Sequence, residues 1–346
     1  MTTHNENEWL RFRKEFKNSL SVESLFDGIL RGDRSILSVA LTLIESTVPS
    51  DQEKANALMQ RCIPISGKSM RIGITGVPGV GKSTFIEQLG ILLLAAGKKV
   101  AVLSIDPSSE RSHGSILGDK TRMTHLASSA NAYIRPTASG NSLGGVAQRT
   151  RESIIVCEAA GFDVILIETV GVGQSETAVN ALTDFFLLLM LPVAGDELQG
   201  IKRGIMELAD AVVITKADEM PDKSKIAVQT YKQALHLFPA KDSGWIPNVL
   251  SYSMFDTDSV KRVWNMIETF ETQLIQSGFL EERRKEQSVF WMKESVKDML
   301  WQHLLIQSSD FIEQIEKEVV TGKITPYMAS QKIFTKLIEK NDRTRI

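Results

Sequence analysis

Apolar and polar positions change their spacing several times along the chain. Up to about residue 66, apolar residues recur every three or four positions, which is typical of amphipathic helices. Asp33 stands just before one such stripe and is expected to cap the helix that follows. Residues 1–66 are therefore predicted to form an N-terminal helical extension. The apolar faces of its helices are interpreted as packing surfaces, with binding of a partner as the alternative.

From residue 70 onward, short apolar runs alternate with helical segments. The predicted strands are at 70–75, 100–105, 164–167, 185–191, 211–214 and 249–252. The run at 185–191 is the most apolar, but it is far shorter than the ~20 residues of a spanning helix and therefore indicates a buried strand. The alternation predicts an α/β fold with a doubly wound, mostly parallel sheet over residues 67–258.

From residue 259 the chain is again predicted to be helical. Helices are expected at 260–277, at 281–307 and at 309–320, and Thr325 with Pro326 is expected to start a last helix. Apolar residues are too dense between 290 and 305 to stay in water, so this stretch packs either on the core or on a second subunit. Residues 259–346 are therefore expected to form a helical region that takes part in dimerisation.

Composition narrows the classes of function. The net charge of the 346 residues is −2, so no global basic field favours nucleic acid. The first residues are polar and charged, unlike a secretory signal. Cys62 and Cys157 are too few for a disulfide framework or a metal cluster, so a reducing, cytoplasmic setting is expected. Because no apolar run is long enough to span a membrane, no membrane contact is expected either.

A glycine-rich loop that fits G-x-x-x-x-G-K-[ST] follows the first predicted strand and opens a predicted helix. The loop consists of Gly76, Val77, Pro78, Gly79, Val80, Gly81, Lys82 and Ser83, and Thr84 follows it. Backbone N–H groups of such a loop point into one concavity at a helix N-terminus and bind phosphates. Lys82 is expected on the β- and γ-phosphates and Ser83 on Mg²⁺. The motif alone does not separate a GTPase from an ATPase or a kinase.

Acidic residues follow two predicted strands and lie within one long connection. Asp106 comes directly after the strand at 100–105, and Glu168 ends the strand before Gly171. Because ligands gather at the carboxyl ends of parallel strands, both acids are expected near Mg²⁺, and the Gly171 N–H near the γ-phosphate. Asp119 lies in a candidate switch and is a third acidic candidate. A turn, a helix cap or a solvated loop is the alternative role for Asp106 and Asp119.

The next strand leads into the tetrad Thr-Lys-Ala-Asp, close to the Asn-Lys-x-Asp of guanine-specific proteins. Asp218 can accept from both N–H groups at the guanine edge, while the stem of Lys216 lies along the base. Thr215 departs from the pattern, and its hydroxyl cannot reproduce both hydrogen bonds of an amide, which predicts weaker guanine affinity. A backbone N–H at Ser253 or Met254 is expected to reach the guanine carbonyl.

In order and spacing these residues resemble the MeaB/MMAA/ArgK family of metallochaperone GTPases. The resemblance covers nearly the whole chain and rests on the glycine loop, the tetrad and segments 106–109, 114–123, 168–176 and 195–202. It implies a homodimeric, Mg²⁺-dependent GTPase that hydrolyses GTP to GDP. It also implies a chaperone of an adenosylcobalamin-dependent acyl-CoA mutase, chiefly methylmalonyl-CoA mutase, that gates cofactor loading and protects the mutase.

The same resemblance implies roles for particular residues. Asp106, Asp119 and Glu168 would form the acidic surround of the metal. The loop at 195–202 would be a further switch, in which Gln199 and Lys202 couple contact with the mutase to hydrolysis.

Two other classes of protein remain as alternatives. One is an ATP-using ATPase or kinase, the transport label that relatives of ArgK have carried; Asp218 argues against it and Thr215 leaves it open. The other is a nickel-delivery GTPase, which would need paired Cys or His ligands, whereas the five histidines are scattered and the cysteines stand apart. Competition between GDP and ADP would separate the first alternative from the leading interpretation.

Overall fold

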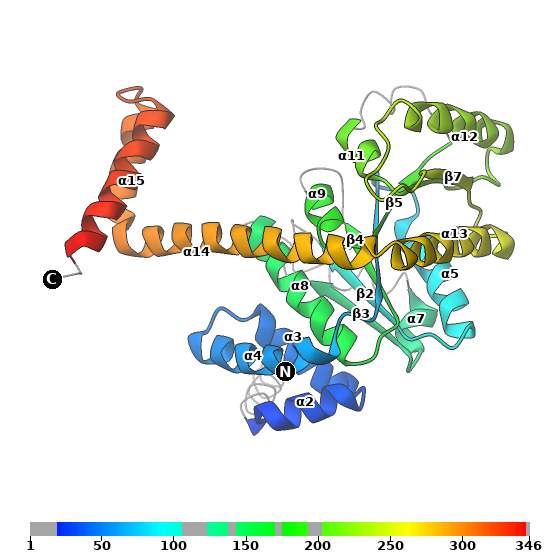
Figure 1. Ribbon diagram of the computed structural model, residues 1–346, viewed down its shortest axis with the longest axis horizontal. Coiled ribbons are helices and arrows are strands. Elements are labelled where there is room, and N and C mark those ends of the chain that lie inside the picture. The colour runs from blue at the N-terminus through cyan, green and yellow to red at the C-terminus, as the bar shows by residue number, and fades with distance from the viewer. Residues whose placement is uncertain (1–18, 106–122, 138–142, 170–174, 193–202, 344–346) are drawn as a thin grey trace, which may run out of the picture. The chain divides into compact units, whose positions relative to one another are not determined.

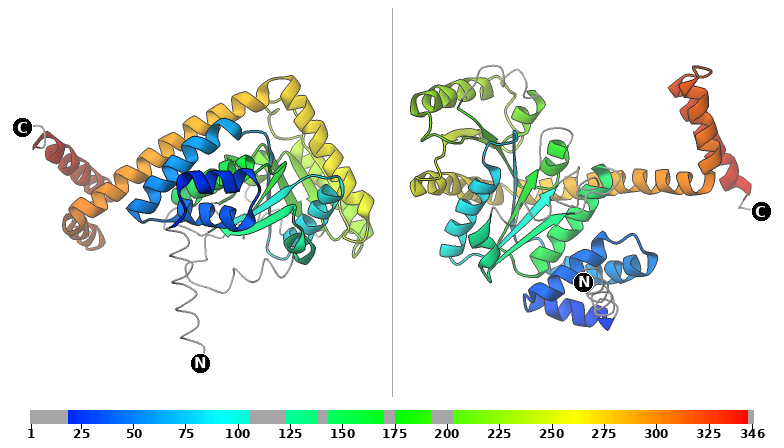
Figure 2. Two further views of the ribbon diagram at one scale, coloured as in Figure 1. Left: turned by 90° about the horizontal axis from the view of Figure 1, so that it is seen from below. Right: turned by 180° about the vertical axis from the view of Figure 1, so that it is seen from behind.

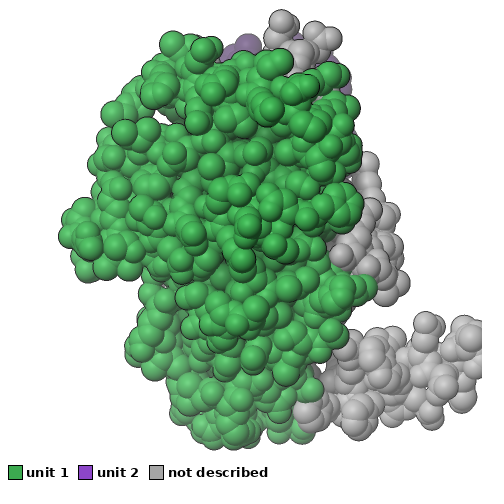
Figure 3. Space-filling view, turned by 90° about the vertical axis from the view of Figure 1, so that its right-hand side faces the viewer, with its two compact units in different colours: residues 1–287 green, residues 288–346 purple. Residues whose placement is uncertain are grey.

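A computed structural model describes residues 19–105, 123–137, 143–169, 175–192 and 203–343 (Figure 1). The chain forms two compact units, residues 1–287 and residues 288–346, which Figure 3 colours separately. The boundaries expected at residues 66 and 258 remain predictions.

A seven-stranded sheet forms the centre of the first unit. Its strands are β1 (Met70–Gly76), β2 (Val100–Ile105), β3 (Ala132–Thr137), β4 (Val164–Thr169), β5 (Phe185–Met190), β6 (Ala211–Ile214) and β7 (Asn248–Ser251). They are hydrogen-bonded in the order β3-β2-β4-β1-β5-β6-β7, and each pairing is parallel. The α/β fold with a parallel sheet is confirmed, and β1 lies in its middle.

The structure adds one strand that the pattern did not predict. β3 contains Pro136, which lacks an N–H group and therefore argues against a strand assignment from sequence. The strand order places β3 at an edge of the sheet, where a missing donor is tolerated.

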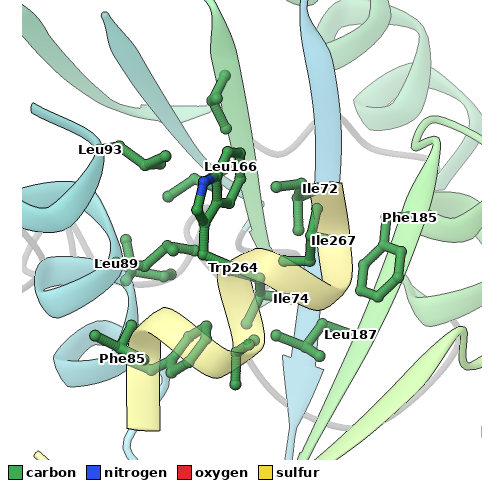
Figure 4. Close-up of a cluster of buried hydrophobic side chains, with 14 of the residues drawn as sticks. Ile72, Ile74, Phe85, Leu89, Leu93, Leu166, Phe185, Leu187, Trp264 and Ile267 are labelled. Atoms are coloured by element: carbon green, nitrogen blue, oxygen red, sulfur yellow. The ribbon is translucent and has the colours of Figure 1, made fainter. Parts of the chain in front are cut away.

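Two long helices cover one face of the sheet. These are α5 (Lys82–Ala95) and α13 (Thr257–Gln276), which pack against each other and against buried side chains of the central strands. Figure 4 shows the cluster: Ile72, Ile74, Leu166, Phe185 and Leu187 from the strands meet Phe85, Leu89, Leu93, Trp264 and Ile267 from the helices. The short helix α7 (Thr124–Ser128) joins this face beside α5.

Helices of the N-terminal extension pack against α8 (Leu143–Ala159), away from α5 and α13 (Figure 2). They are α2 (Val22–Leu30), α3 (Arg34–Glu45) and α4 (Pro49–Cys62). The Asp33 carboxylate accepts from the N–H groups of Ser35 and Ile36, so the predicted cap of α3 is confirmed. The remaining described elements of this unit are η1 (Ile63–Ile65), α9 (Ser175–Asn180), α11 (Arg203–Leu208) and α12 (Pro221–Leu235).

An ion-pair network lies where β1 and β5 begin, at the amino edge of the sheet. Arg284, in the first turns of α14 (Phe279–Val320), donates from Nε and Nη2 to the two carboxylate oxygens of Asp184 at 2.8 and 2.6 Å. Arg71 likewise donates to both oxygens of Glu158, at 2.8 and 3.1 Å. A third pair joins Lys241 to Asp210 at 2.6 Å. We call these six residues the amino-edge network.

The second unit contains the rest of α14 and α15 (Pro326–Arg343). Ser308 has a non-helical φ of −141°, so the predicted break at this position is confirmed. The predicted cap of α15 is confirmed too, because the Thr325 hydroxyl accepts from the Met328 N–H at 3.2 Å. In the described part of the chain, no helix has the length and apolar character needed to cross a lipid bilayer.

Candidate functional site

The glycine loop lies at the carboxyl end of β1, in the middle of the sheet. Gly76 has φ of 153°, and a Cβ there would lie 2.5 Å from the carbonyl oxygen of Leu189, so a side chain at this position would collide with β5. Gly81 caps α5 with a left-handed φ of 95°. These conformations turn the backbone sharply into the N-terminus of α5, where unpaired N–H groups favour an anion.

Lys82 and Ser83 start α5 directly after this turn. The Lys82 ammonium donates to the carbonyl oxygens of Gly76, at 2.8 Å, and of Val77, at 3.3 Å, so its positive charge lies over the loop. The Ser83 hydroxyl donates to Oε1 of Glu168 at 3.2 Å. Two residues that are 85 positions apart in sequence thus meet at one end of the sheet, and Thr84 follows them half-buried.

Glu168 is placed by the pairing of β4 with its neighbours. It lies opposite Ile74 of β1 and opposite Ser104 of β2, and it is 3% exposed. Beside it, the Thr169 hydroxyl donates to the Thr75 hydroxyl at 2.8 Å, which ties the ends of β4 and β1 together. The sheet therefore holds the Glu168 carboxylate beside the glycine loop, so its position does not depend on a flexible segment.

The donor set of this end of the sheet fits a magnesium ion. Mg²⁺ prefers hard oxygen ligands and is usually held by one or two carboxylates together with substrate phosphates. The Ser83 hydroxyl and the buried Glu168 carboxylate are such donors and already lie within hydrogen-bond distance. Ser83 and Glu168 could therefore hold Mg²⁺ between the loop and β4.

The tetrad at the end of β6 contacts the glycine loop through Thr215. Its hydroxyl donates to the carbonyl oxygen of Val80 at 2.7 Å and, at a longer 3.2 Å, to that of Met190. Lys216 has φ of 53° and is the one non-glycine residue with a positive φ in the described ranges. Asp218 is exposed, and Lys216 is half-buried. The hydroxyl of Thr215 thus supports the phosphate loop, a contact that sequence reasoning did not foresee.

The segment after β7 runs beside the tetrad. The Ala217 N–H donates to the carbonyl oxygen of Tyr252 at 3.1 Å. The Ser253 N–H donates to the Ser259 hydroxyl at 3.2 Å, so this N–H already has a partner within the chain. Met254, the other predicted backbone donor, is 47% exposed.

Five predicted site residues lie outside the described residues: Asp106, Asp119, Gly171, Gln199 and Lys202. Their roles remain predictions. Sequence reasoning also passed over Tyr252, although a polar aromatic residue at the end of an apolar run, directly before Ser253, was a visible signal.

Neither cysteine has the properties of a catalytic nucleophile or a metal ligand. Both are buried, and burial raises the pKa of Cys62 to about 11 and that of Cys157 to about 12. Both thiols therefore stay protonated near neutral pH, and a thiol is a poor nucleophile and metal ligand.

A glycine loop between a central parallel strand and a helix, with Lys82 and Ser83 at its end, defines a P-loop nucleotide-binding protein. The family model described as "Methylmalonyl Co-A mutase-associated GTPase MeaB" matches residues 37–309. The chain belongs to this family.

Similar proteins from distant organisms agree with the family. A probable GTPase of Mycobacterium bovis is 46% identical over 318 residues, covering 90% of this chain and 94% of the relative. GTPase ArgK of Escherichia coli is 46% identical over 275 residues, or 79% and 83% of the two chains. The mitochondrial methylmalonic aciduria type A homolog of Mus musculus is 41% identical over 327 residues, or 91% and 79%.

A solved structure has the same fold. It is described as an LAO/AO transport system kinase, is 35% identical, and superposes with a TM-score of 0.74 over 92% of this chain and 97% of its own. The predicted family is therefore confirmed, and GTP binding and hydrolysis are implied by it.

Proposed function

We propose that this protein is a Mg²⁺-dependent GTPase that serves as chaperone of an adenosylcobalamin-dependent acyl-CoA mutase of the methylmalonyl-CoA type. It would gate cofactor loading and protect the mutase from inactivation. The observation that carries the GTPase part is the contact between Ser83 and Glu168, which joins the P-loop to an acidic strand end at 3.2 Å.

Hydrolysis would depend on how the chain places charge around the phosphates. The Lys82 ammonium, which lies over the loop carbonyls, would move the short distance to the β- and γ-phosphates. Ser83 and Glu168 would hold Mg²⁺, which when bound offsets the negative charge that develops on the phosphate oxygens. Asp106 and Asp119 would complete the acidic surround, and the Gly171 N–H would face the γ-phosphate.

Base choice would be made at the tetrad. The exposed Asp218 carboxylate would accept from the two N–H groups of guanine, and the stem of Lys216 would cover the base. Because the Ser253 N–H is occupied by Ser259, the donor to the guanine carbonyl would be the N–H of Met254.

The mutase as partner is supported by the description of the family. Gln199 and Lys202 would couple contact with the mutase to hydrolysis. A homodimer is supported by the first half of α14 in the second unit, where several apolar side chains are about half exposed, among them Phe290, Met299 and Trp301. A second copy of this helix would cover them.

The test is the rate of GTP hydrolysis with Mg²⁺, measured with and without an adenosylcobalamin-dependent acyl-CoA mutase from the same source. A large acceleration by the mutase would support both nucleotide and partner. Intrinsic hydrolysis without acceleration would reject the partner, and no hydrolysis in either case would reject the GTPase. Lys82→Ala is the control for activity that does not come from this site.

An ATP-using enzyme is the second candidate. It is favoured by Thr215, which replaces the asparagine of guanine-specific tetrads and whose hydroxyl donates into the P-loop. The similar solved structure that is described as a transport system kinase also supports this candidate. Displacement of labelled GDP by unlabelled GDP but not by ADP would exclude it.

A further inference from the structure

Tyr252 joins three parts of the nucleotide site. Directly after β7, its N–H donates to the carbonyl oxygen of Ile214 at 2.8 Å, and its carbonyl accepts from the Ala217 N–H at 3.1 Å. These bonds join its backbone to Ile214, directly before the tetrad, and to Ala217 within it. Its ring meets the ring of Phe85, in the first turn of α5, edge to face with 5.0 Å between centroids. The backbone of Tyr252 is therefore held at the tetrad, and its ring is held against the helix that follows the glycine loop.

The hydroxyl of Tyr252 is buried and has no partner in the part of the chain that the structure describes. Tyr252 is 3% exposed, and within the described ranges its hydroxyl makes no hydrogen bond. A buried hydroxyl that has lost water and gained no partner destabilises a fold, so such groups call for a physical reason. Burial, and secondly the negative charge of Asp218, raise the pKa of Tyr252. The hydroxyl therefore stays protonated as a donor, and Asp218 is the charged group that acts on it.

Thr215 makes a second donor near the base necessary. An asparagine at this position would offer two amide N–H groups, whereas a threonine hydroxyl has one hydrogen. In this chain that hydrogen is directed to the carbonyls of Val80 and Met190. The Tyr252 hydroxyl is a buried donor without a partner among the described residues, and the backbone of Tyr252 is bonded to Ala217 of the tetrad.

We propose that Tyr252 is a positioning residue for guanine recognition. When the two guanine N–H groups bind the Asp218 carboxylate, the Tyr252 hydroxyl donates to the same carboxylate and fixes its orientation. A carboxylate offers about four lone-pair sites, so it can accept all three hydrogen bonds. The inference rests on the proposed function, in which Asp218 reads guanine, and it adds a residue that compensates for Thr215.

The test is Tyr252→Phe, which removes the hydroxyl and keeps the ring on Phe85. GDP affinity should fall roughly tenfold, as expected for loss of a hydrogen bond to a charged group, while ADP affinity stays the same. The thermal midpoint of the nucleotide-free protein should stay equal or rise, because an unpaired buried hydroxyl is removed. A merely structural hydroxyl would instead lower the midpoint and weaken GDP and ADP equally, and either result would overturn the proposal.

Two controls complete the experiment. Tyr231→Phe removes the same atom from a fully buried tyrosine of α12 and should leave GDP affinity unchanged. In an Asp218→Asn background, Tyr252→Phe should cost no further GDP affinity; an additional tenfold loss there would overturn the proposal. If the wild type itself binds GDP no better than ADP, guanine recognition by Asp218 fails. If the wild type prefers GDP and Tyr252→Phe binds GDP as tightly as the wild type does, only the role of Tyr252 fails.

Discussion

Buried charged side chains lie at both ends of the central strands, at the amino edge and at the carboxyl edge of the sheet, but their bonding partners differ. At the amino edge, Asp184, Glu158 and Asp210 are each bound to a cation of the same chain within 2.6 to 2.8 Å. At the carboxyl edge, the Lys82 ammonium donates to two loop carbonyls, and the Glu168 carboxylate accepts from the Ser83 hydroxyl. The amino edge is a closed network of ion pairs, whereas the carboxyl edge holds a buried lysine and a buried carboxylate beside the glycine loop.

This difference teaches where substitutions should act. Breaking a closed network leaves a buried charge without its partner, so it should lower the stability of the fold. Removing a charge from the carboxyl edge, beside the glycine loop, should instead impair nucleotide chemistry more than it impairs the fold. Stability and activity can therefore be assigned to opposite ends of the same strands.

The largest effect is expected for Lys82→Ala. Loss of the ammonium that stabilises charge on the transferring phosphate should lower the rate of GTP hydrolysis about 10³-fold. The thermal midpoint without nucleotide should change little, because the carbonyl oxygens that accept from Lys82 belong to Gly76 and Val77 of the same local loop. Unchanged turnover in a single-turnover assay would disprove the P-loop assignment.

Arg284→Met should give the opposite result. It removes both hydrogen bonds from Arg284 to the Asp184 carboxylate, whose side chain is fully buried, and the free energy of unfolding should fall by about 3 kcal/mol. Denaturant titration measures this change, and GDP affinity of the folded protein should stay the same. A loss of GDP affinity without a loss of stability would contradict the division between the edges.

Thr215→Asn is expected to tighten GDP binding several-fold. One amide N–H can keep the contact with the Val80 carbonyl while the other becomes available to the base. Calorimetric titration with GDP measures the effect, with Thr215→Val as the matched variant that loses the hydroxyl and should bind more weakly. The gain is expected to be modest because Tyr252 is proposed to compensate for Thr215 in part. Weaker affinity of Thr215→Asn would contradict the view that Thr215 limits guanine binding.

The smallest effect is expected for Lys285→Ala, at the position that follows Arg284 in the sequence. Lys285 pairs with Glu281 at 2.8 Å, but both side chains are mostly in water, where ion pairs contribute little. Lys285→Ala should therefore leave the denaturation midpoint and GDP affinity unchanged. A loss comparable to that of Arg284→Met would show that burial of the amino-edge network is not what matters.

Local patterns predicted a large part of the fold. Six of the seven strands, the Asp33 cap and the break at Ser308 follow from apolar spacing and from residues with strong local preferences. β3 was missed because Pro136 is acceptable only at a sheet edge, and edge position is a property of the assembled sheet. The helix α12 was missed as well, in a charged segment without a clear apolar stripe.

The sequence by itself determined the chemistry of the P-loop, because Gly76 to Ser83 act as one continuous segment whose spacing is local. Only the tertiary structure decided which distant groups meet it. It brought Glu168 to Ser83, turned the Thr215 hydroxyl toward Val80, and joined Arg284 to Asp184 across 100 positions. Such contacts depend on the order and register of parallel strands, which no local spacing specifies.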